Sequence, residues 1–211
     1  MNKLLALCFS LALPALAAAD VEGMVWIGPD FYIDIYEYPN QRGTLPKVDV
    51  TWGEAESLCA EQGKRLCTEQ EWQKACTGPQ NFAYSYGEEF EPGRCNTRFA
   101  VDGVWQRGPG LAPSGAYERC TNDYGVYDMI GNVWEWTASW YSRSDRWRIV
   151  RGGSFFHNVN LARADARYGR FLDSDYRLDL VGFRCCLSAA PPSAELRTSA
   201  SSVESSKPQT P

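Results

Sequence analysis

The chain has 211 residues, a formal net charge of −5 and a hydrophobic fraction of 44%. Acidic and basic residues are interspersed and form no basic stripe, so the sequence argues against nucleic acid as a partner. A mildly acidic surface of this kind mainly favours solubility.

The amino terminus has the order of a secretion signal. Lys3 supplies the positive charge, residues 4–13 form a short apolar core, and the small-residue run 15–19 precedes Asp20. This order predicts a signal peptide over residues 1–19 and therefore a periplasmic or secreted protein. The apolar run is too short to cross a bilayer, which needs about 20 residues, so we expect no membrane span.

Chain length and composition predict a single domain. Removal of the signal leaves about 190 residues, which suits one domain with a sizeable core. From Ala189 onward the chain is rich in Pro, Ser, Thr and Ala and has almost no large apolar residue. Such a segment cannot bury enough surface to offset the entropy cost of ordering. We expect a folded domain over residues 20–188 and a disordered tail over residues 189–211.

The first predicted elements are a strand and two helices. Residues 31–36 alternate as in a half-buried strand. Thr51 can cap a helix that ends near Gly63. A second helix begins at Thr68, where Glu71 three residues later completes a capping box.

Irregular structure dominates the middle of the chain. Residues 78–122 are rich in Gly, Pro, Asn and aromatic residues and show little periodicity. A segment of this length is either held in place or disordered, and its aromatic residues and two cysteines favour the first. Apolar runs at residues 149–156 and 181–187 then predict short strands.

Seven cysteines follow the predicted signal peptide. In an oxidising compartment such cysteines form disulfides, and an odd number leaves one over. The second helix would separate Cys67 and Cys76 by roughly 13 Å, too far for a disulfide, which needs α-carbons within about 7 Å. We expect Cys95 to pair with Cys120, because they lie within the irregular segment and a bridge would explain how it is held.

Four motifs occur in order: GKRLCTEQEW at residues 63–72, YGVYDMIGNVWEW at 124–136, RGGSF at 151–155 and GFRC at 182–185. In this order and spacing the chain resembles the formylglycine-generating enzyme, or sulfatase-modifying factor, family over about residues 21–187. The resemblance implies an α+β, C-type-lectin-like fold with low regular secondary structure.

The resemblance also implies bound calcium. By position, Asp128 and Glu135 supply carboxylates, and Gly131 and Val133 supply backbone carbonyls. Calcium takes oxygen ligands of these two kinds. The alternative is that Glu135 is merely solvated between two core tryptophans. A weaker second set comprises Asn96, the Thr97 carbonyl and Asp102.

The oxidases of this family carry a cysteine three residues after the serine of RGGS and a second five residues further on. These two thiolates bind copper(I), which prefers soft ligands. In this chain Ser154 is followed by His157 and Ala162 at those positions, while Arg163 and Arg167 fit the family pattern. One imidazole cannot form a dithiolate copper site, so copper is not expected. One histidine also cannot form the facial triad of non-heme iron alone, which leaves iron open.

His157 has three interpretations. We favour a hydrogen-bonding residue that lines a pocket, ahead of a general acid or base and ahead of a metal ligand. Nearby carboxylates that could orient it are Asp165, Asp173 and Asp175. The other candidate binding residues are Ser154, Trp134 and Arg163.

The resemblance also implies a bridge between Cys59 and Cys185. Cys186 is the next residue on a strand, so its side chain faces the opposite way and needs another partner. Cys67 is the first choice for that partner and Cys76 the second.

Two functions remain open at this point. The first is a calcium-stabilised protein- or peptide-binding or regulatory module without oxidase activity, that is, a pseudoenzyme. The second is an enzyme whose site is rebuilt around His157 to act on a peptide or a small molecule, with or without a metal.

Overall fold

The computed structural model describes residues 21–106, 110–170 and 172–189. The predicted signal peptide, and the predicted tail beyond Ala189, lie outside these ranges. The elements, in chain order, are β1 (Met24–Trp26), β2 (Phe31–Asp34), α1 (Trp52–Glu61), β3 (Arg65–Leu66), α2 (Glu69–Thr77), β4 (Phe99–Val101), β5 (Val104–Gln106), β6 (Trp134–Ser142), β7 (Trp147–Arg151), β8 (Arg167–Tyr168), β9 (Val181–Phe183) and β10 (Cys185–Ser188). Neither described helix is long and apolar enough to cross a membrane.

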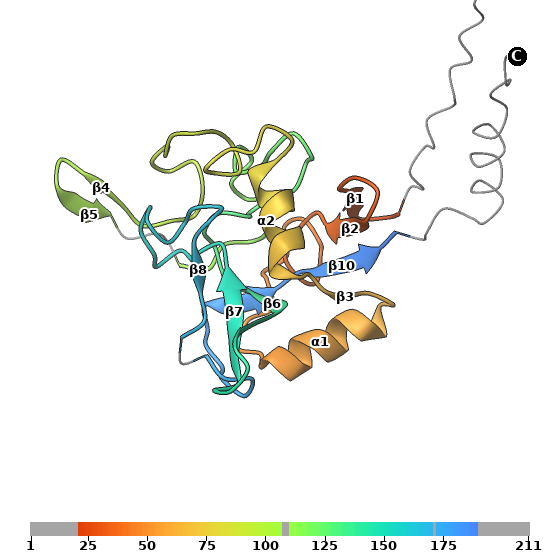
Figure 1. Ribbon diagram of the computed structural model, residues 1–211. Helices are drawn as coiled ribbons and strands as arrows, with labels where there is room; N and C mark the ends of the chain where they lie inside the picture. Colours follow the sequence, from red (N-terminus) through yellow and green to blue (C-terminus); the bar gives the residue numbers. More distant parts are fainter. Residues whose placement is uncertain (1–20, 107–109, 171, 190–211) are drawn as a thin grey trace, which may run out of the picture.

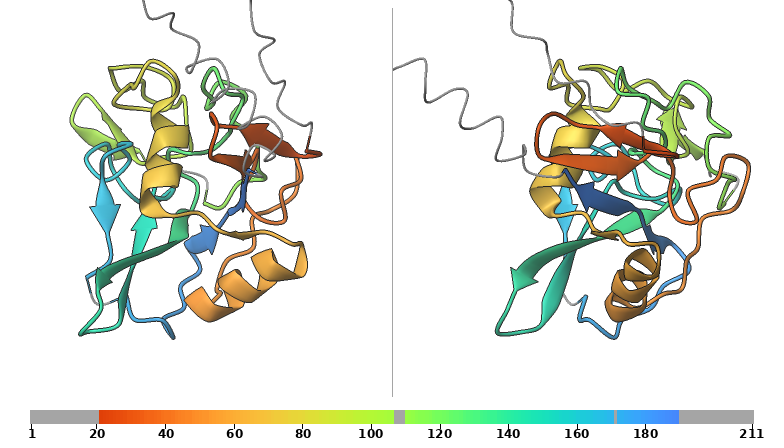
Figure 2. Two further views of the ribbon diagram at one scale, coloured as in Figure 1. Left: turned by 45° about the vertical axis from the view of Figure 1, so that its right-hand side comes forward. Right: turned by 90° about the vertical axis from the view of Figure 1, so that its right-hand side faces the viewer.

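Two four-stranded sheets organise the domain, with orders β1-β2-β10-β3 and β8-β7-β6-β9. In the second sheet β6 and β9 are parallel, whereas β6–β7 and β7–β8 are antiparallel. The hairpin β4–β5 is separate and projects from the body of the molecule (Figure 1). Figure 2 shows α1 and the turn of the β6–β7 hairpin at one end of the molecule, and β1–β2 with the loops after α2 at the other.

Both helices begin with capping boxes, of which the sequence predicts the one at Thr68 and predicts Thr51 as the cap of the other. The Thr51 hydroxyl accepts from the Glu54 backbone N–H (3.2 Å), and the Glu54 carboxylate accepts from the Thr51 N–H (2.9 Å). Thr68 and Glu71 repeat this arrangement at the start of α2. The prediction of the two helices is therefore confirmed, since each start signal lies within four consecutive residues.

The strand predictions are correct in place but too long. Strand β2 covers only residues 31–34, and all four are buried rather than half-buried. Strand β7 ends at Arg151 because Gly152 and Gly153 have φ values of 92° and 75°, which only glycine adopts readily. The last apolar run divides into β9 and β10 at Arg184, whose side chain is buried.

Three disulfides link six of the cysteines: Cys59–Cys185, Cys67–Cys186 and Cys95–Cys120. These are the pairs expected from the sequence and the family resemblance. Cys76 is free and buried on α2. The first two bridges tie the α1–α2 region to β10, and the third holds the irregular segment.

The Arg148 side chain joins α1 to the second sheet. Its guanidinium carbon lies 3.4 Å from the Trp52 ring centroid and 3.3 Å from that of Trp140, so the cation is held between two indoles. Burial lowers the pKa of Arg148 to about 10. This contact anchors the end of the sheet opposite the site described next.

Candidate functional site

The candidate site is built on the glycine turn after β7. A Cβ on Gly152 would lie 3.1 Å from the Met129 carbonyl oxygen, and one on Gly153 would lie 3.0 Å from that of Leu161. The turn therefore requires glycine for space as well as for φ. The turn buries Ser154 completely and places His157 three residues further on. The backbone N–H of His157 donates to the Ser154 carbonyl (2.9 Å).

Two donors fix the tautomer of His157. The Trp134 indole N–H donates to Nδ1 (3.1 Å), and the Ser154 Oγ lies 2.7 Å from the same nitrogen. An indole N–H can only donate, so Nδ1 is the unprotonated nitrogen and the proton is on Nε2. Burial lowers the pKa of His157, which agrees with a neutral ring. His157 therefore offers one N–H donor to a ligand.

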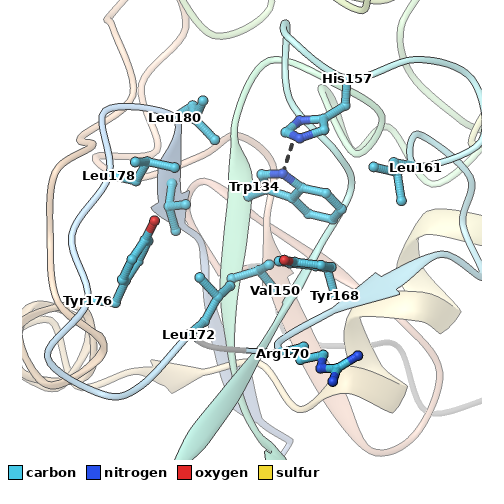
Figure 3. A pocket seen from close by; sticks show the side chains of 11 residues that line it. Trp134, Val150, His157, Leu161, Tyr168, Arg170, Leu172, Tyr176, Leu178 and Leu180 are labelled. Carbon is cyan, nitrogen blue, oxygen red and sulfur yellow. Dashed lines mark hydrogen bonds between the residues drawn. The ribbon is translucent and has the colours of Figure 1, made fainter.

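A cavity of about 370 Å³ opens beside this histidine. Figure 3 shows the His157 ring above Trp134, with Leu178 and Leu180 on one side and Leu161 on the other. Val150, Leu172 and Val181 add to an apolar lining, and polar groups come from His157, Tyr168, Arg170 and Tyr176. A largely apolar pocket of this volume with few polar groups is typical of a ligand site.

A second, smaller cavity of about 140 Å³ lies on the other side of His157. It shares His157 and Leu161 with the first cavity and adds Arg98, Trp105, Phe156 and Asn158. The two cavities share a wall formed by His157 and Leu161. We call them together the cleft, and separately the apolar lobe and the Arg98 lobe.

The cleft lacks the geometry of a catalytic dyad or triad. Ser154 is fully buried, so its hydroxyl is not accessible to a substrate. Within the described residues no carboxylate hydrogen-bonds His157. Asp165 instead pairs with Arg163 (2.9 Å), and Asp173 accepts from the Asp175 backbone N–H (3.0 Å). None of the three aspartates predicted as orienting groups contacts the imidazole.

Arg163 was predicted as a binding residue, but it does not line either lobe. Its guanidinium pairs with Asp165 and lies 5.6 Å from the Tyr84 ring centroid. Of the predicted binding residues, the structure brings Trp134 into the apolar lobe and Ser154 directly behind His157.

The predicted calcium ligand Glu135 is used differently. Its Oε1 accepts from Arg184 Nη2 (2.7 Å), and its Oε2 accepts from Arg184 Nε and from Trp72 Nε1 (2.7 Å each). Both Glu135 and Arg184 are buried. The carboxylate is therefore neutralised and hydrogen-bonded in this arrangement. Its role as a calcium ligand stays a prediction.

Asp128 is the other carboxylate of the predicted calcium set. It is buried, its Oδ2 accepts from the Gly115 N–H (2.6 Å), and burial raises its pKa to about 6. Glu37 is buried nearby and accepts from Ser114 Oγ (2.7 Å) and Asn132 Nδ2 (3.0 Å). Burial and then the Asp128 charge raise the pKa of Glu37 well above its ordinary value. This region therefore contains more carboxyl groups than the single positive charge of the buried Arg184 can neutralise.

In the sequence, Gly131 and Val133 lie between Asp128 and Glu135. A Cβ on Gly131 would lie 2.3 Å from the Asn96 carbonyl oxygen. Of the weaker second set, Asn96 is buried and its amide donates to Asn132 Oδ1 (2.8 Å), whereas Asp102 lies in the exposed β4–β5 turn. Asn96 thus supports the turn that contains Gly131 and Asn132, and a site shared with Asp102 stays a prediction. Across the described ranges no three His, Cys, Asp or Glu side chains are grouped to hold a metal.

Sequence reasoning did not identify the residues that complete the cleft. Arg98 and Trp105 belong to the β4–β5 region, which shows no clear periodicity. Leu178 and Leu180 stand two apart in a charged stretch, a weak sign that both face one side. No motif marks any of them.

Comparison with known proteins agrees with this architecture. Residues 23–189 match the family model described as "Sulfatase-modifying factor enzyme 1-like domain". The inactive C-alpha-formylglycine-generating enzyme 2 of Bos taurus is 39% identical over 166 residues, covering 72% of this chain and 53% of that protein. The formylglycine-generating enzyme of Thermomonospora curvata is 32% identical over 206 residues, covering 82% and 67%.

Among solved structures, Treponema denticola variable protein 1 superposes with a TM-score of 0.60 at 15% identity, covering 82% of this chain and 94% of that one. This likeness concerns the fold and agrees with an α+β, C-type-lectin-like domain of low regular secondary structure. The chain spans about half the length of the inactive mammalian relatives that it matches. On the family model and the identity to these relatives, the chain belongs to the sulfatase-modifying factor, or formylglycine-generating enzyme-like, family.

Proposed function

We propose that this chain is an exported pseudoenzyme of the formylglycine-generating enzyme family that binds a protein or peptide segment in the cleft around His157. The observation that carries the proposal is the state of His157. It occupies the position of the first catalytic cysteine, and its Nδ1 accepts from Trp134 and Ser154. It therefore serves as a fixed hydrogen-bond donor beside an apolar lobe.

Two further findings support this proposal. The position of the second cysteine is taken by Ala162, which is fully buried and offers no ligand atom or nucleophile. The bovine relative at 39% identity is itself described as inactive. Three disulfides are consistent with an oxidising compartment, which supports export.

Calcium is part of the proposal as a stabilising ion. The proposed ligands are the carboxylates of Asp128 and Glu135 and the backbone carbonyls of Gly131 and Val133. When bound, calcium would neutralise excess acid in a buried region. Glu135 also forms the ion pair with Arg184.

Nuclear magnetic resonance provides a direct test of binding. A panel of capped pentapeptides with apolar, acidic or basic residues would be titrated while indole N–H resonances are recorded. We expect some peptides to shift the Trp134 signal, because this N–H bonds His157 in the cleft. The Trp52 indole donates to the Thr137 carbonyl (2.8 Å) outside the cleft and should not move.

A cavity-filling variant supplies the control. Leu178→Trp should fill the apolar lobe and abolish the shifts, whereas Leu45→Trp, at an exposed position outside the lobe, should leave them unchanged. Circular dichroism would check that both variants fold. A panel in which no peptide perturbs Trp134 would refute peptide binding at this site.

A second assay tests whether the oxidase activity of the family is absent. The protein would be incubated with oxygen, copper and a Cys-x-Pro-x-Arg peptide, and the products analysed by mass spectrometry. We expect no aldehyde, since neither position three nor position eight after Ser154 is a cysteine. Reproducible conversion of the peptide thiol would overturn the assignment as a pseudoenzyme.

A further inference from the structure

The Arg98 lobe contains a cation held by aromatic rings. The Arg98 guanidinium carbon lies 5.1 Å from the Trp105 ring centroid and 5.8 Å from that of Phe156. Both residues are exposed, with exposed fractions of 48% for Trp105 and 59% for Phe156. The Arg98 backbone N–H donates to the His157 carbonyl (3.0 Å), which fixes this arginine beside the histidine.

This arginine has no anionic partner in the part of the chain that the structure describes. Its side chain forms no ion pair there, and its Nε is buried without a hydrogen-bond partner. Most other arginines in the fold are paired, as Arg163 is with Asp165 and Arg177 with Glu54. Stacking on aromatic rings does not use the N–H groups of a guanidinium, which form a planar fork suited to a carboxylate.

The neighbouring lobe has the opposite character. It is largely apolar. Because Nδ1 of His157 already accepts from Trp134 and Ser154, the ring nitrogen available to a ligand is Nε2, which carries the proton. Across a shared wall of His157 and Leu161 the cleft thus offers apolar volume, the neutral donor of His157 and two arginines, Arg170 in the apolar lobe and Arg98 in the other. No carboxylate of the described chain lines either lobe.

We propose that the cleft recognises an acidic peptide segment in which a large apolar residue and an acidic residue stand two positions apart. The apolar side chain occupies the apolar lobe, a backbone carbonyl accepts from His157 Nε2, and the carboxylate pairs with Arg98. Successive side chains of an extended peptide face opposite ways, so residues two apart reach the two lobes of one cleft. This inference rests on the peptide binding proposed above and specifies its ligand.

Matched peptides and proteins test the charge rule. The probe is acetyl-Gly-Phe-Gly-Glu-Gly-amide, and its partners replace Glu with Gln or Lys, or Phe with Ala. Titration calorimetry would be run on the wild type, on Arg98→Gln and on Arg143→Gln. Arg143 is a suitable control because it also lies near an indole, 5.4 Å from the Trp140 centroid, and lines neither lobe.

We expect the Gln peptide to bind the wild type about tenfold more weakly than the Glu peptide, as for the loss of one charged hydrogen bond. Arg98→Gln should bind the two peptides equally, while Arg143→Gln should retain the tenfold preference. The peptide with Lys in place of Glu should bind more weakly than the Gln peptide. The peptide with Ala in place of Phe should bind more weakly than the Glu peptide.

Two results would overturn the inference. They are equal binding of the Glu and Gln peptides to the wild type, and a preference for the Glu peptide that survives Arg98→Gln. If uncharged or basic peptides still shift Trp134, peptide binding stands and the acidic specificity fails. If no peptide of either set binds, both proposals fail.

Discussion

The nested disulfides lead to a counterintuitive stability prediction. Cys59–Cys185 spans 126 residues and Cys95–Cys120 spans 25. In the chain-entropy model, these spans alone correspond to about 4.9 and about 3.5 kcal/mol of stabilisation. Considered singly, the longer bridge should therefore matter more.

The third bridge reverses this order. Cys67–Cys186 already joins the same two regions, so with it intact the Cys59–Cys185 bond closes only the short path through the Cys67–Cys186 bridge. That path runs from residue 59 to 67 and then from 186 to 185, a loop of about ten residues that corresponds to about 2.7 kcal/mol. Removing Cys59–Cys185 alone should therefore cost less than removing Cys95–Cys120.

Urea unfolding of two alanine pairs tests this order. Cys59→Ala with Cys185→Ala should lose about 2.7 kcal/mol, and Cys95→Ala with Cys120→Ala about 3.5 kcal/mol. Both pairs would be made in a Cys76→Ala background, because the buried free thiol could otherwise exchange with the remaining bridges. A larger loss from the Cys59–Cys185 pair than from the Cys95–Cys120 pair would refute the nested-loop reasoning.

Three further predictions follow from single groups. Chelation of calcium should lower the melting temperature of the wild type but not that of Asp128→Asn. The Glu135→Ala variant should lose about 3–5 kcal/mol of unfolding free energy in calorimetry, with or without calcium, because it leaves Arg184 buried and unpaired. The pKa of His157 is lowered from 6.5, so its neutral form stabilises the fold above that pH. The free-energy difference between wild type and His157→Asn in urea should shrink as pH falls below 6.5, and a constant difference would contradict the neutral assignment. Arg148→Lys should lose about 2 kcal/mol by urea unfolding, since an ammonium cannot stack between Trp52 and Trp140.

The features that the sequence predicts well depend on neighbouring residues. A capping box needs only Thr68 and Glu71, which are three positions apart, and it starts α2 where expected. The strand prediction over 149–156 fails at Gly152 because the glycine pair leaves the extended conformation. That change serves the site, since it turns the chain so that Ser154 and His157 meet.

The candidate site is less predictable because its partners are distant in sequence. Glu135 and Arg184 both lie in recognised motifs, yet they are 49 residues apart and no local rule pairs them. The calcium assignment, which was taken from the motif, could therefore not include this ion pair, and it stays a prediction. Arg98 had no signal at all, because its role depends on a hairpin that brings Trp105 back beside it.

The replacement of the two cysteines changes more than the metal chemistry of the cleft. A neutral imidazole held by Trp134 and Ser154 can donate from Nε2, but its Nδ1 cannot act as a base while both donors are present. The same hydrogen bonds that occupy Nδ1 therefore keep the Nε2 donor in one orientation. A fixed donor between an apolar lobe and a cation favours recognition over turnover, because binding needs complementarity to the ground state, whereas catalysis needs it to a transition state.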